Sequence, residues 1–134
     1  MALGVTPDTK LAKAAGLELG IKESILVDER METSVADIYA VGDAVQVKHS
    51  VTGADVLISL AGPANRQGRI AADNICGGKS IYHGSQGSSV IKIFRLTGAA
   101  TGINERTAKK PESNVDKVIL SSNEPMRDII RAEK

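Results

Sequence analysis

The sequence has few aromatic residues, a single cysteine and no long apolar run. Aromatic residues make up 2% of the 134 residues, which leaves no stacking platform for single-stranded nucleic acid. The lone cysteine, Cys76, excludes an internal disulfide framework and a CxxC redox pair. No run of about 18 apolar residues is present, so no membrane-spanning helix is predicted. The first residues lack the apolar core of a signal peptide, and a cytoplasmic location is expected.

The charge of the chain is nearly balanced. With 17 basic and 16 acidic residues its net charge is +1, which argues against nucleic-acid binding by phosphate neutralisation. An apolar content of 42% in a chain of this length suits one soluble domain with a modest core.

Two kinds of functional motif are also missing. The chain has no Gly-x-Gly-x-x-Gly loop, which normally supplies amides to the pyrophosphate of a dinucleotide. His49 and His83 lie in predicted loops without a cysteine or carboxylate at ligand spacing, so no metal site is predicted. Cys76 ends a predicted helix, where packing is the usual role of a lone cysteine. No catalytic residue is therefore predicted.

The most informative stretch covers residues 33–44. The apolar run at residues 38–41 predicts a buried strand that ends at Gly42-Asp43. Open α/β sheets bind ligands at the carboxyl ends of their strands, where Gly42 permits close backbone approach and Asp43 can accept hydrogen bonds from hydroxyl groups. The alternative is an ordinary turn, where Gly and Asp are common. Residues 46–55 lack a helical period and are predicted to form an irregular loop.

A second informative stretch, residues 57–75, predicts a helix. Pro63 suits its first turn, and Gly77-Gly78 provides a stop. Its amino terminus would offer unpaired amides and about half a positive charge. Apolar or small side chains recur at helical spacing and predict a narrow packed face at positions 57, 60, 61, 64, 68, 71, 72 and 75.

The flanking segments predict shorter elements. Before residue 33 we expect a helix over residues 9–15, closed by Gly16, and a strand over residues 24–28. Residues 79–89, rich in Gly and Ser, are typical of a linker. The later segments predict a strand with one buried face at 89–96, a helix at 104–110, a strand at 115–120 and a charged amphipathic helix at 124–134.

These motifs resemble a known family. Thr33-Ser34, followed by Asp37-Ile38-Tyr39-Ala40-Val41-Gly42-Asp43-Ala44, is similar to the second flavin-binding motif of the FAD-dependent pyridine nucleotide-disulfide oxidoreductases. The segment Leu60-Ala61-Gly62-Pro63-Ala64-Asn65-Arg66-Gln67-Gly68-Arg69 resembles the helix that this family directs at its flavin. The similarity covers roughly residues 2–121, and it fits best the subgroup of coenzyme A-disulfide reductases, NADH oxidases and NADH peroxidases.

The resemblance implies a set of cofactor-binding residues. Asp43, in the segment Gly42-Asp43-Ala44, would hold the ribitol chain of FAD, and the backbone at Leu60 and Ala61 would face the pyrimidine side of the flavin. The family often has proline where this chain has Ala36, and Cys76 does not match the family's redox cysteine.

The resemblance also implies a domain organisation. We expect an α/β fold: a partial FAD/NAD(P)-binding Rossmann-like half over residues 1–78, a linker over 79–88, and the start of an α+β dimerisation domain over 89–134. Because the first flavin motif and the NADH motif are absent, the chain looks like a carboxyl-terminal segment, either truncated or the product of a degenerate gene. Open sheet edges in such a segment predict a homo-oligomer.

Two functional hypotheses follow. In the first, the chain is part of a flavoenzyme that passes electrons from NAD(P)H through FAD to a disulfide, peroxide or oxygen, although the isolated chain is expected to be inactive. In the second, it is a non-catalytic structural or dimerisation module with no bound cofactor.

Overall fold

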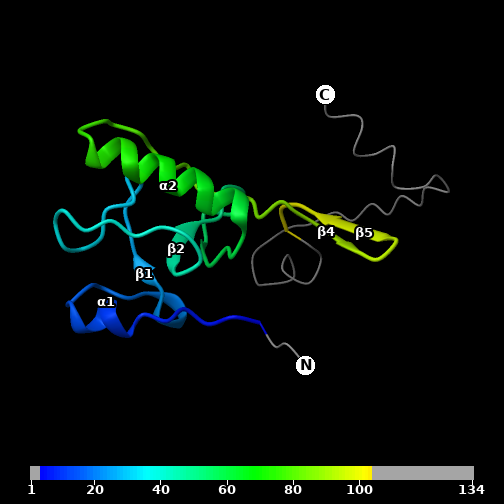
Figure 1. The fold of residues 1–134 in the computed structure, drawn as a ribbon, viewed down its shortest axis with the longest axis horizontal. Coiled ribbons are helices and arrows are strands. Elements are labelled where there is room, and N and C mark those ends of the chain that lie inside the picture. The colour runs from blue at the N-terminus through cyan, green and yellow to red at the C-terminus, as the bar shows by residue number, and fades with distance from the viewer. Residues whose placement is uncertain (1–3, 104–134) are drawn as a thin grey trace. The chain divides into compact units, whose positions relative to one another are not determined.

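The computed structural model describes residues 4–103 of the chain. The chain separates into two compact units, Met1–Gly87 and Ser88–Lys134. The elements expected at residues 104–110, 115–120 and 124–134 lie outside the described residues. Within residues 4–103 both helices and strands are present, so the predicted mixed α/β character is confirmed (Figure 1).

The first unit contains a three-stranded sheet and two α-helices (Figure 1). The central strand β2 (Val45–Lys48) pairs in parallel with β1 (Ile25–Leu26) and antiparallel with β3 (Asp55–Val56). The helices are α1 (Lys10–Ala14) and α2 (Ala61–Ile75), and a 3-10 turn spans Ile21–Glu23. The strand expected over residues 24–28 is therefore present as the shorter β1.

The core of this unit lies between β2 and α2. Val45 and Val47 alternate with less buried residues along β2, as expected for a strand with one packed face. Ile70 and Ala71 of α2 pack in the same cluster. The buried apolar residues of this cluster are Met31, Val45, Val47, Ile70, Ala71 and Tyr82.

Both α-helices end as their sequences predict. After α1, Gly16 has a φ of +79°, and the amides of Gly16 and Leu17 donate to the carbonyls of Lys13 and Ala12. After α2, Gly77 has a φ of +85°, and the amides of Gly77 and Gly78 donate to the carbonyls of Asn74 and Asp73. This double pattern is the Schellman motif, which glycine favours because it adopts positive φ without strain.

The prediction of a buried strand at residues 38–41 is wrong. Only Tyr39 of this run forms an isolated bridge, to Glu32, and the side chains of Ile38 and Val41 are 37% and 40% exposed. The buried strand is instead β2, inside the segment expected to be an irregular loop, which also contains β3. Paired neighbours stabilise a strand, and β2 has both β1 and β3, while residues 38–41 have only the isolated bridge to Glu32.

The packed face of α2 is rotated from the predicted one. Its buried residues are Gln67, Ile70, Ala71 and Asn74, and only Ala71 belonged to the predicted set. The helical period of the burial is as expected, at intervals of three and four residues. The prediction from apolar and small residues passed over Gln67 and Asn74 because they are polar, and it also missed the apolar Ile70, which lies on the same face as these two.

Much of the segment expected to be a linker packs into the first unit. Tyr82 is buried, and its amide donates to the carbonyl of Glu29 at 2.8 Å. Ser85 forms a parallel bridge with His49. The boundary between the two compact units therefore falls between Gly87 and Ser88.

The described part of the second unit is a β-hairpin. Strands β4 (Ser89–Ile93) and β5 (Leu96–Ala100) pair antiparallel, with Ile93 opposite Leu96. The two-residue turn contains Phe94 at a φ of +53°. All five residues of β4 are exposed, so the single buried face expected from its alternation is not found. None of the helices between residues 4 and 103 is long and apolar enough to cross a membrane.

Candidate functional site

The turn at Gly42-Asp43-Ala44 leads into the central strand of the sheet. Gly42 has a φ of +89°, a conformation that glycine adopts without strain, and β2 begins at Val45. The turn therefore lies at the amino end of β2 and not, as predicted, at the carboxyl end of a strand. The side chain of Asp43 is exposed, and its carboxylate has no hydrogen bond or ion pair with residues 4–103. It is free to accept hydrogen bonds from a ligand.

Two elements hold this turn in place. The amide of Ile25 in β1 donates to the carbonyl of Ala44 at 2.8 Å. From α2, the side-chain Oε1 of Gln67 accepts a hydrogen bond from the amide of Gly42 at 2.7 Å. Asp43 lies between these two anchored residues, so its backbone is fixed while its carboxylate faces solvent.

The amino terminus of α2 is open. The carbonyl of Leu60 accepts the amide of Ala64 at 3.1 Å, and the amide of Leu60 donates to the carbonyl of Ile58 at 3.0 Å. The amides of Ala61 and Gly62 have no acceptor in the described part of the chain, and no side chain caps the helix. In a helix of 15 residues these amides carry the positive end of the helix dipole.

The structure connects both predicted flavin-binding segments to one helix. Leu60 and Ala61 lie at the start of α2, and the turn at Gly42 is bonded to Gln67, two helical turns further along. At 1.5 Å per residue, Gln67 lies about 10 Å beyond Leu60 along the helix axis.

Sequence reasoning missed Gln67 as a site residue. Its signal was present in the spacing, because Gln67 precedes Ile70 and Ala71 by three and four positions and shares their face. A polar residue on a buried helical face needs a hydrogen-bond partner, and here that partner is the amide of Gly42.

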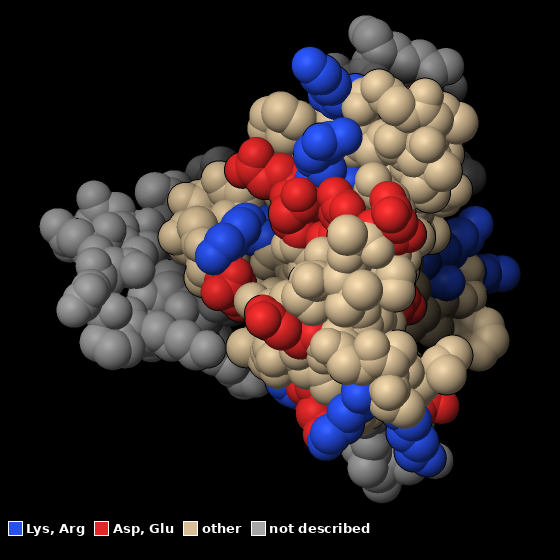
Figure 2. All heavy atoms as spheres, turned by 90° about the vertical axis from the view of Figure 1, so that its left-hand side faces the viewer, with Lys and Arg blue, Asp and Glu red and all other residues tan. Residues whose placement is uncertain are grey.

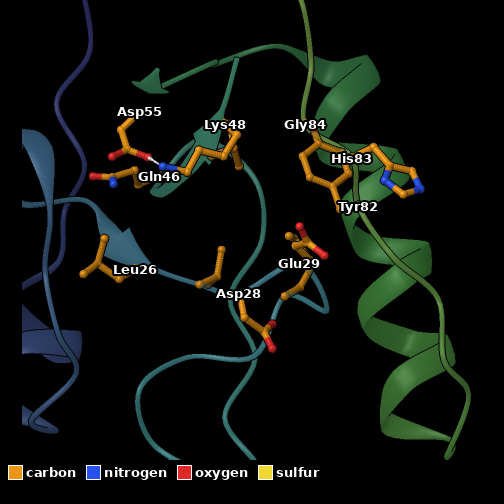
Figure 3. A pocket seen from close by; sticks show the side chains of 12 residues that line it. Leu26, Asp28, Glu29, Gln46, Lys48, Asp55, Tyr82, His83 and Gly84 are labelled. Atoms are coloured by element: carbon orange, nitrogen blue, oxygen red, sulfur yellow. Dashed lines mark ion pairs between the residues drawn. The ribbon is translucent and has the colours of Figure 1, made fainter. Parts of the chain in front are cut away.

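A separate cavity of about 550 Å³ lies beside the sheet (Figure 3). Tyr82 contributes to its wall, and its buried hydroxyl has no partner among the described residues. None of the five predicted flavin-binding residues lines this cavity. Its lining residues are Leu26, Val27, Asp28, Glu29, Met31, Gln46, Val47, Lys48, Asp55, Tyr82, His83 and Gly84.

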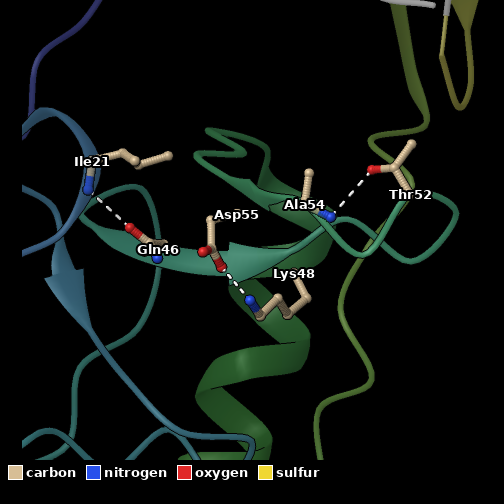
Figure 4. A network of polar contacts seen from close by, with 6 residues as sticks. All are labelled: Ile21, Gln46, Lys48, Thr52, Ala54 and Asp55. Carbon is tan, nitrogen blue, oxygen red and sulfur yellow. Dashed lines mark hydrogen bonds and ion pairs between the residues drawn. The ribbon is translucent and has the colours of Figure 1, made fainter. Parts of the chain in front are cut away.

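Polar contacts tie β2 to its neighbours at the edge of this cavity (Figure 4). Oε1 of Gln46 accepts the amide of Ile21 at 2.8 Å, and Nζ of Lys48 lies 2.7 Å from Oδ1 of Asp55. The hydrogen bond from Lys48, together with its charge, lowers the pKa of Asp55 below its ordinary value. Because both side chains are exposed, this pair contributes little to stability.

His49 has a structural role, whereas Cys76 is not packed as the sequence suggested. Nδ1 of His49 accepts the amides of Val51 and Thr52, both at 3.3 Å, and so organises a turn. Cys76 is exposed and unpaired. Residues 4–103 contain no group of three or more His, Cys, Asp or Glu side chains that could hold a metal ion. On the face shown in Figure 2, acidic and basic side chains are interspersed.

Comparison with known proteins identifies the relatives of this chain. The family model described as pyridine nucleotide-disulphide oxidoreductase matches residues 1–68, a range that includes Gly42, Asp43, Ala44, Leu60 and Ala61. The chain is 36% identical over 123 residues to the NAD(P)H sulfur oxidoreductase (CoA-dependent) of Pyrococcus furiosus, covering 92% of this chain and 28% of that protein. It is 42% identical over 108 residues to the NADH oxidase of Methanocaldococcus jannaschii, covering 81% and 24%.

A solved structure is also similar to this chain. The crystal structure of reduced Bacillus anthracis CoADR-RHD matches with 53% sequence identity and a TM-score of 0.75, over 78% of this chain and 19% of that one. The chain thus spans about a quarter of the length of the curated relatives it matches.

Proposed function

Because this chain belongs to the pyridine nucleotide-disulphide oxidoreductases, we propose that it forms the part of a flavoenzyme that holds the ribityl chain and pyrimidine edge of FAD. In the whole protein, electrons would pass from NAD(P)H through FAD to a disulfide, peroxide or oxygen. The observation that carries this proposal is the exposed, unpartnered carboxylate of Asp43 on a turn anchored by β1 and α2.

The chemistry of the available donors and acceptors fits part of a flavin. A carboxylate accepts hydrogen bonds from the hydroxyls of a ribityl chain, and charge-assisted hydrogen bonds of this kind are strong. The free amides of Ala61 and Gly62 would stabilise negative charge on the pyrimidine edge. FAD, when bound, supplies the redox chemistry, while these residues bind and orient it. No Gly-x-Gly-x-x-Gly loop is present for the pyrophosphate, so the isolated chain should bind FAD weakly.

The names of the relatives support the reaction class. The Pyrococcus furiosus protein is named an NAD(P)H sulfur oxidoreductase, and the Methanocaldococcus jannaschii protein an NADH oxidase. Both names describe oxidation of a reduced nicotinamide nucleotide, with different acceptors. These names favour a sulfur compound or oxygen as the electron acceptor of the whole protein.

The test is FAD binding to the 134-residue chain, measured by equilibrium dialysis and by the visible spectrum of the retained flavin. Removing a charged hydrogen-bond acceptor costs about 1.5–3 kcal/mol, so Asp43→Ala should weaken FAD binding roughly 10- to 100-fold. Asp8→Ala removes another exposed aspartate and serves as the control. Equal FAD affinity in Asp43→Ala and the unaltered chain, or no binding by either, would contradict the proposal.

A second function, assembly of two copies, is favoured by the β4–β5 hairpin. Its apolar side chains are exposed, and Phe94 is 94% exposed at the turn. Exposed apolar clusters of this kind mark surfaces that associate with other proteins. We propose that the hairpin pairs with a second copy of the chain. Its exposed apolar residues are Val90, Ile91, Ile93, Phe94 and Leu96.

Analytical ultracentrifugation over a range of concentrations tests the second function. The unaltered chain should sediment as a dimer or larger assembly, and Phe94→Ser should shift it toward monomer. A chain that remains monomeric at high concentration rules this function out.

A further inference from the structure

Gln67 is the buried polar residue of α2 that contacts the candidate flavin site. Its side chain is 1% exposed, although glutamine is usually found at protein surfaces. The burial is explained by the 2.7 Å hydrogen bond that its Oε1 accepts from the amide of Gly42. In the described part of the chain, no other side chain makes a hydrogen bond with the backbone of residues 42–44.

The hydrogen bond between Gly42 and Gln67 also affects Asp43, the next residue in the chain. The turn follows residues 38–41, of which Ile38 and Val41 are exposed while Tyr39 and Ala40 pack against the core. The last backbone hydrogen bond before the turn runs from the amide of Ala40 to the carbonyl of Met31 at 3.1 Å, and Val41 has none with the described residues. On the other side, Ala44 is fixed by the amide of Ile25. Without Gln67, the Gly42 side of the turn would keep only the 3.5 Å contact between its carbonyl and the amide of Val45.

We infer that Gln67 is a positioning residue, which fixes the carboxylate of Asp43 relative to the open amino terminus of α2. Gln67 and the free amides of Ala61 and Gly62 belong to the same helix. The hydrogen bond that Oε1 of Gln67 accepts from the turn therefore makes both candidate flavin contacts parts of one rigid element. Pre-organisation of this kind raises ligand affinity because less order has to be created on binding. The inference rests on the proposed flavin function.

The chemical identity of Gln67 matters for this role. Its carbonyl oxygen accepts the Gly42 amide without adding charge near Asp43. Methionine has a similar size but a poor acceptor, so Gln67→Met would remove the bond and largely keep the packing. Glutamate would keep an acceptor but bury a negative charge. Gln67→Met is therefore the informative variant.

The first measurement is amide hydrogen exchange at Gly42, followed by NMR without any ligand. Gln67→Met should speed exchange at Gly42 at least about tenfold relative to the amide of His49, which donates to Ala54 away from this turn, because the turn loses its anchor on α2. The matched control is Gln46→Met, since Oε1 of Gln46 accepts the amide of Ile21 at 2.8 Å in another part of the unit. Gln46→Met should speed exchange at Ile21 and leave Gly42 unchanged.

The second measurement is FAD affinity in a double-mutant cycle. If Gln67 acts through Asp43, Gln67→Met should weaken FAD binding about tenfold alone and add little in the Asp43→Ala background. A residue that merely supports the fold would weaken binding by the same factor in both backgrounds, which would overturn the inference.

The two measurements separate failure of the inference from failure of the proposed function. Unchanged exchange at Gly42 in Gln67→Met overturns the positioning role, whatever the FAD affinity. Faster exchange in a chain that does not bind FAD overturns the flavin function itself, and with it the flavin role of Gln67. Faster exchange together with a non-additive loss of FAD affinity supports both.

Discussion

Asn74 and Ser80 are joined by a reciprocal pair of hydrogen bonds. Nδ2 of Asn74 donates to the carbonyl of Ser80, and the amide of Ser80 donates to Oδ1 of Asn74, both at 2.9 Å. Nδ2 also donates to the carbonyl of Arg30 at 2.9 Å. One buried side chain on α2 thus joins two loops that are distant in sequence, as Gln67 joins α2 to the turn at Gly42.

Asn74→Ala should destabilise the first unit by about 2–3 kcal/mol, because it removes three partly buried hydrogen bonds to backbone groups of Arg30 and Ser80. Urea denaturation followed by circular dichroism measures this loss. The neighbouring Asp73 is exposed, and its carboxylate accepts a hydrogen bond from the hydroxyl of Ser80 alone among the described residues. Asp73→Ala should cost less than about 1 kcal/mol. Equal losses in the two variants would contradict the role assigned to Asn74.

Gly42→Ala and Gly68→Ala should change stability in opposite directions. A Cβ at either position meets no atom within 4 Å, so space does not distinguish them. Gly42 has a φ of +89°, where alanine is strained by about 1–2 kcal/mol. Gly68 lies inside α2, where alanine should add about 0.5–1 kcal/mol. Thermal denaturation should show a lower melting temperature for Gly42→Ala and a higher one for Gly68→Ala. An unchanged melting temperature in Gly42→Ala would show that the turn adopts another conformation.

Tyr82→Phe should leave stability unchanged or raise it slightly. The tyrosine is 4% exposed, and its hydroxyl has no hydrogen-bond partner among the described residues. Removing an unsatisfied buried hydroxyl relieves a desolvation cost and keeps the packing of the ring. Urea denaturation provides the comparison. A loss of more than about 1 kcal/mol would mean that the hydroxyl has a partner in solution.

Asp55 should titrate below its ordinary pKa of 3.8, because Lys48 donates a hydrogen bond to its carboxylate and adds a favourable charge. Folding favours the charged form of Asp55, so the contribution of this pair to folding stability is present above the pKa of the unfolded chain. It is lost as the pH falls through the folded pKa. NMR titration of the Asp55 carboxyl should show its pKa rising in Lys48→Met.

The control for this titration is Lys13→Met, which removes the lysine of the exposed Lys13–Glu23 pair. It should leave the pKa of Asp55 unchanged. An unaltered Asp55 pKa in Lys48→Met would show that the 2.7 Å contact does not persist in solution.

Several features of this protein were determined by the sequence alone. Gly16 and Gly77 end their helices as predicted, because the Schellman motif depends on the residues next to the helix end. Gly42 adopts the positive φ that glycine permits at a tight turn. The family was also recognisable, because its motifs depend on residue order.

Other features were decided only by the tertiary structure. Residues 38–41 and 45–48 both contain apolar residues, and only the second run gained strands on both sides. The choice depended on pairing between segments far apart in sequence, which local propensity does not contain.

The same reason applies to the buried face of α2. Gln67 and Asn74 are polar, so the apolar pattern of the sequence excluded them from the core. They are buried because the backbone groups of Gly42, Arg30 and Ser80 lie within hydrogen-bond distance in the folded chain. The sequence determined where the helix ends, and the partners assembled by folding decided which of its faces is inside.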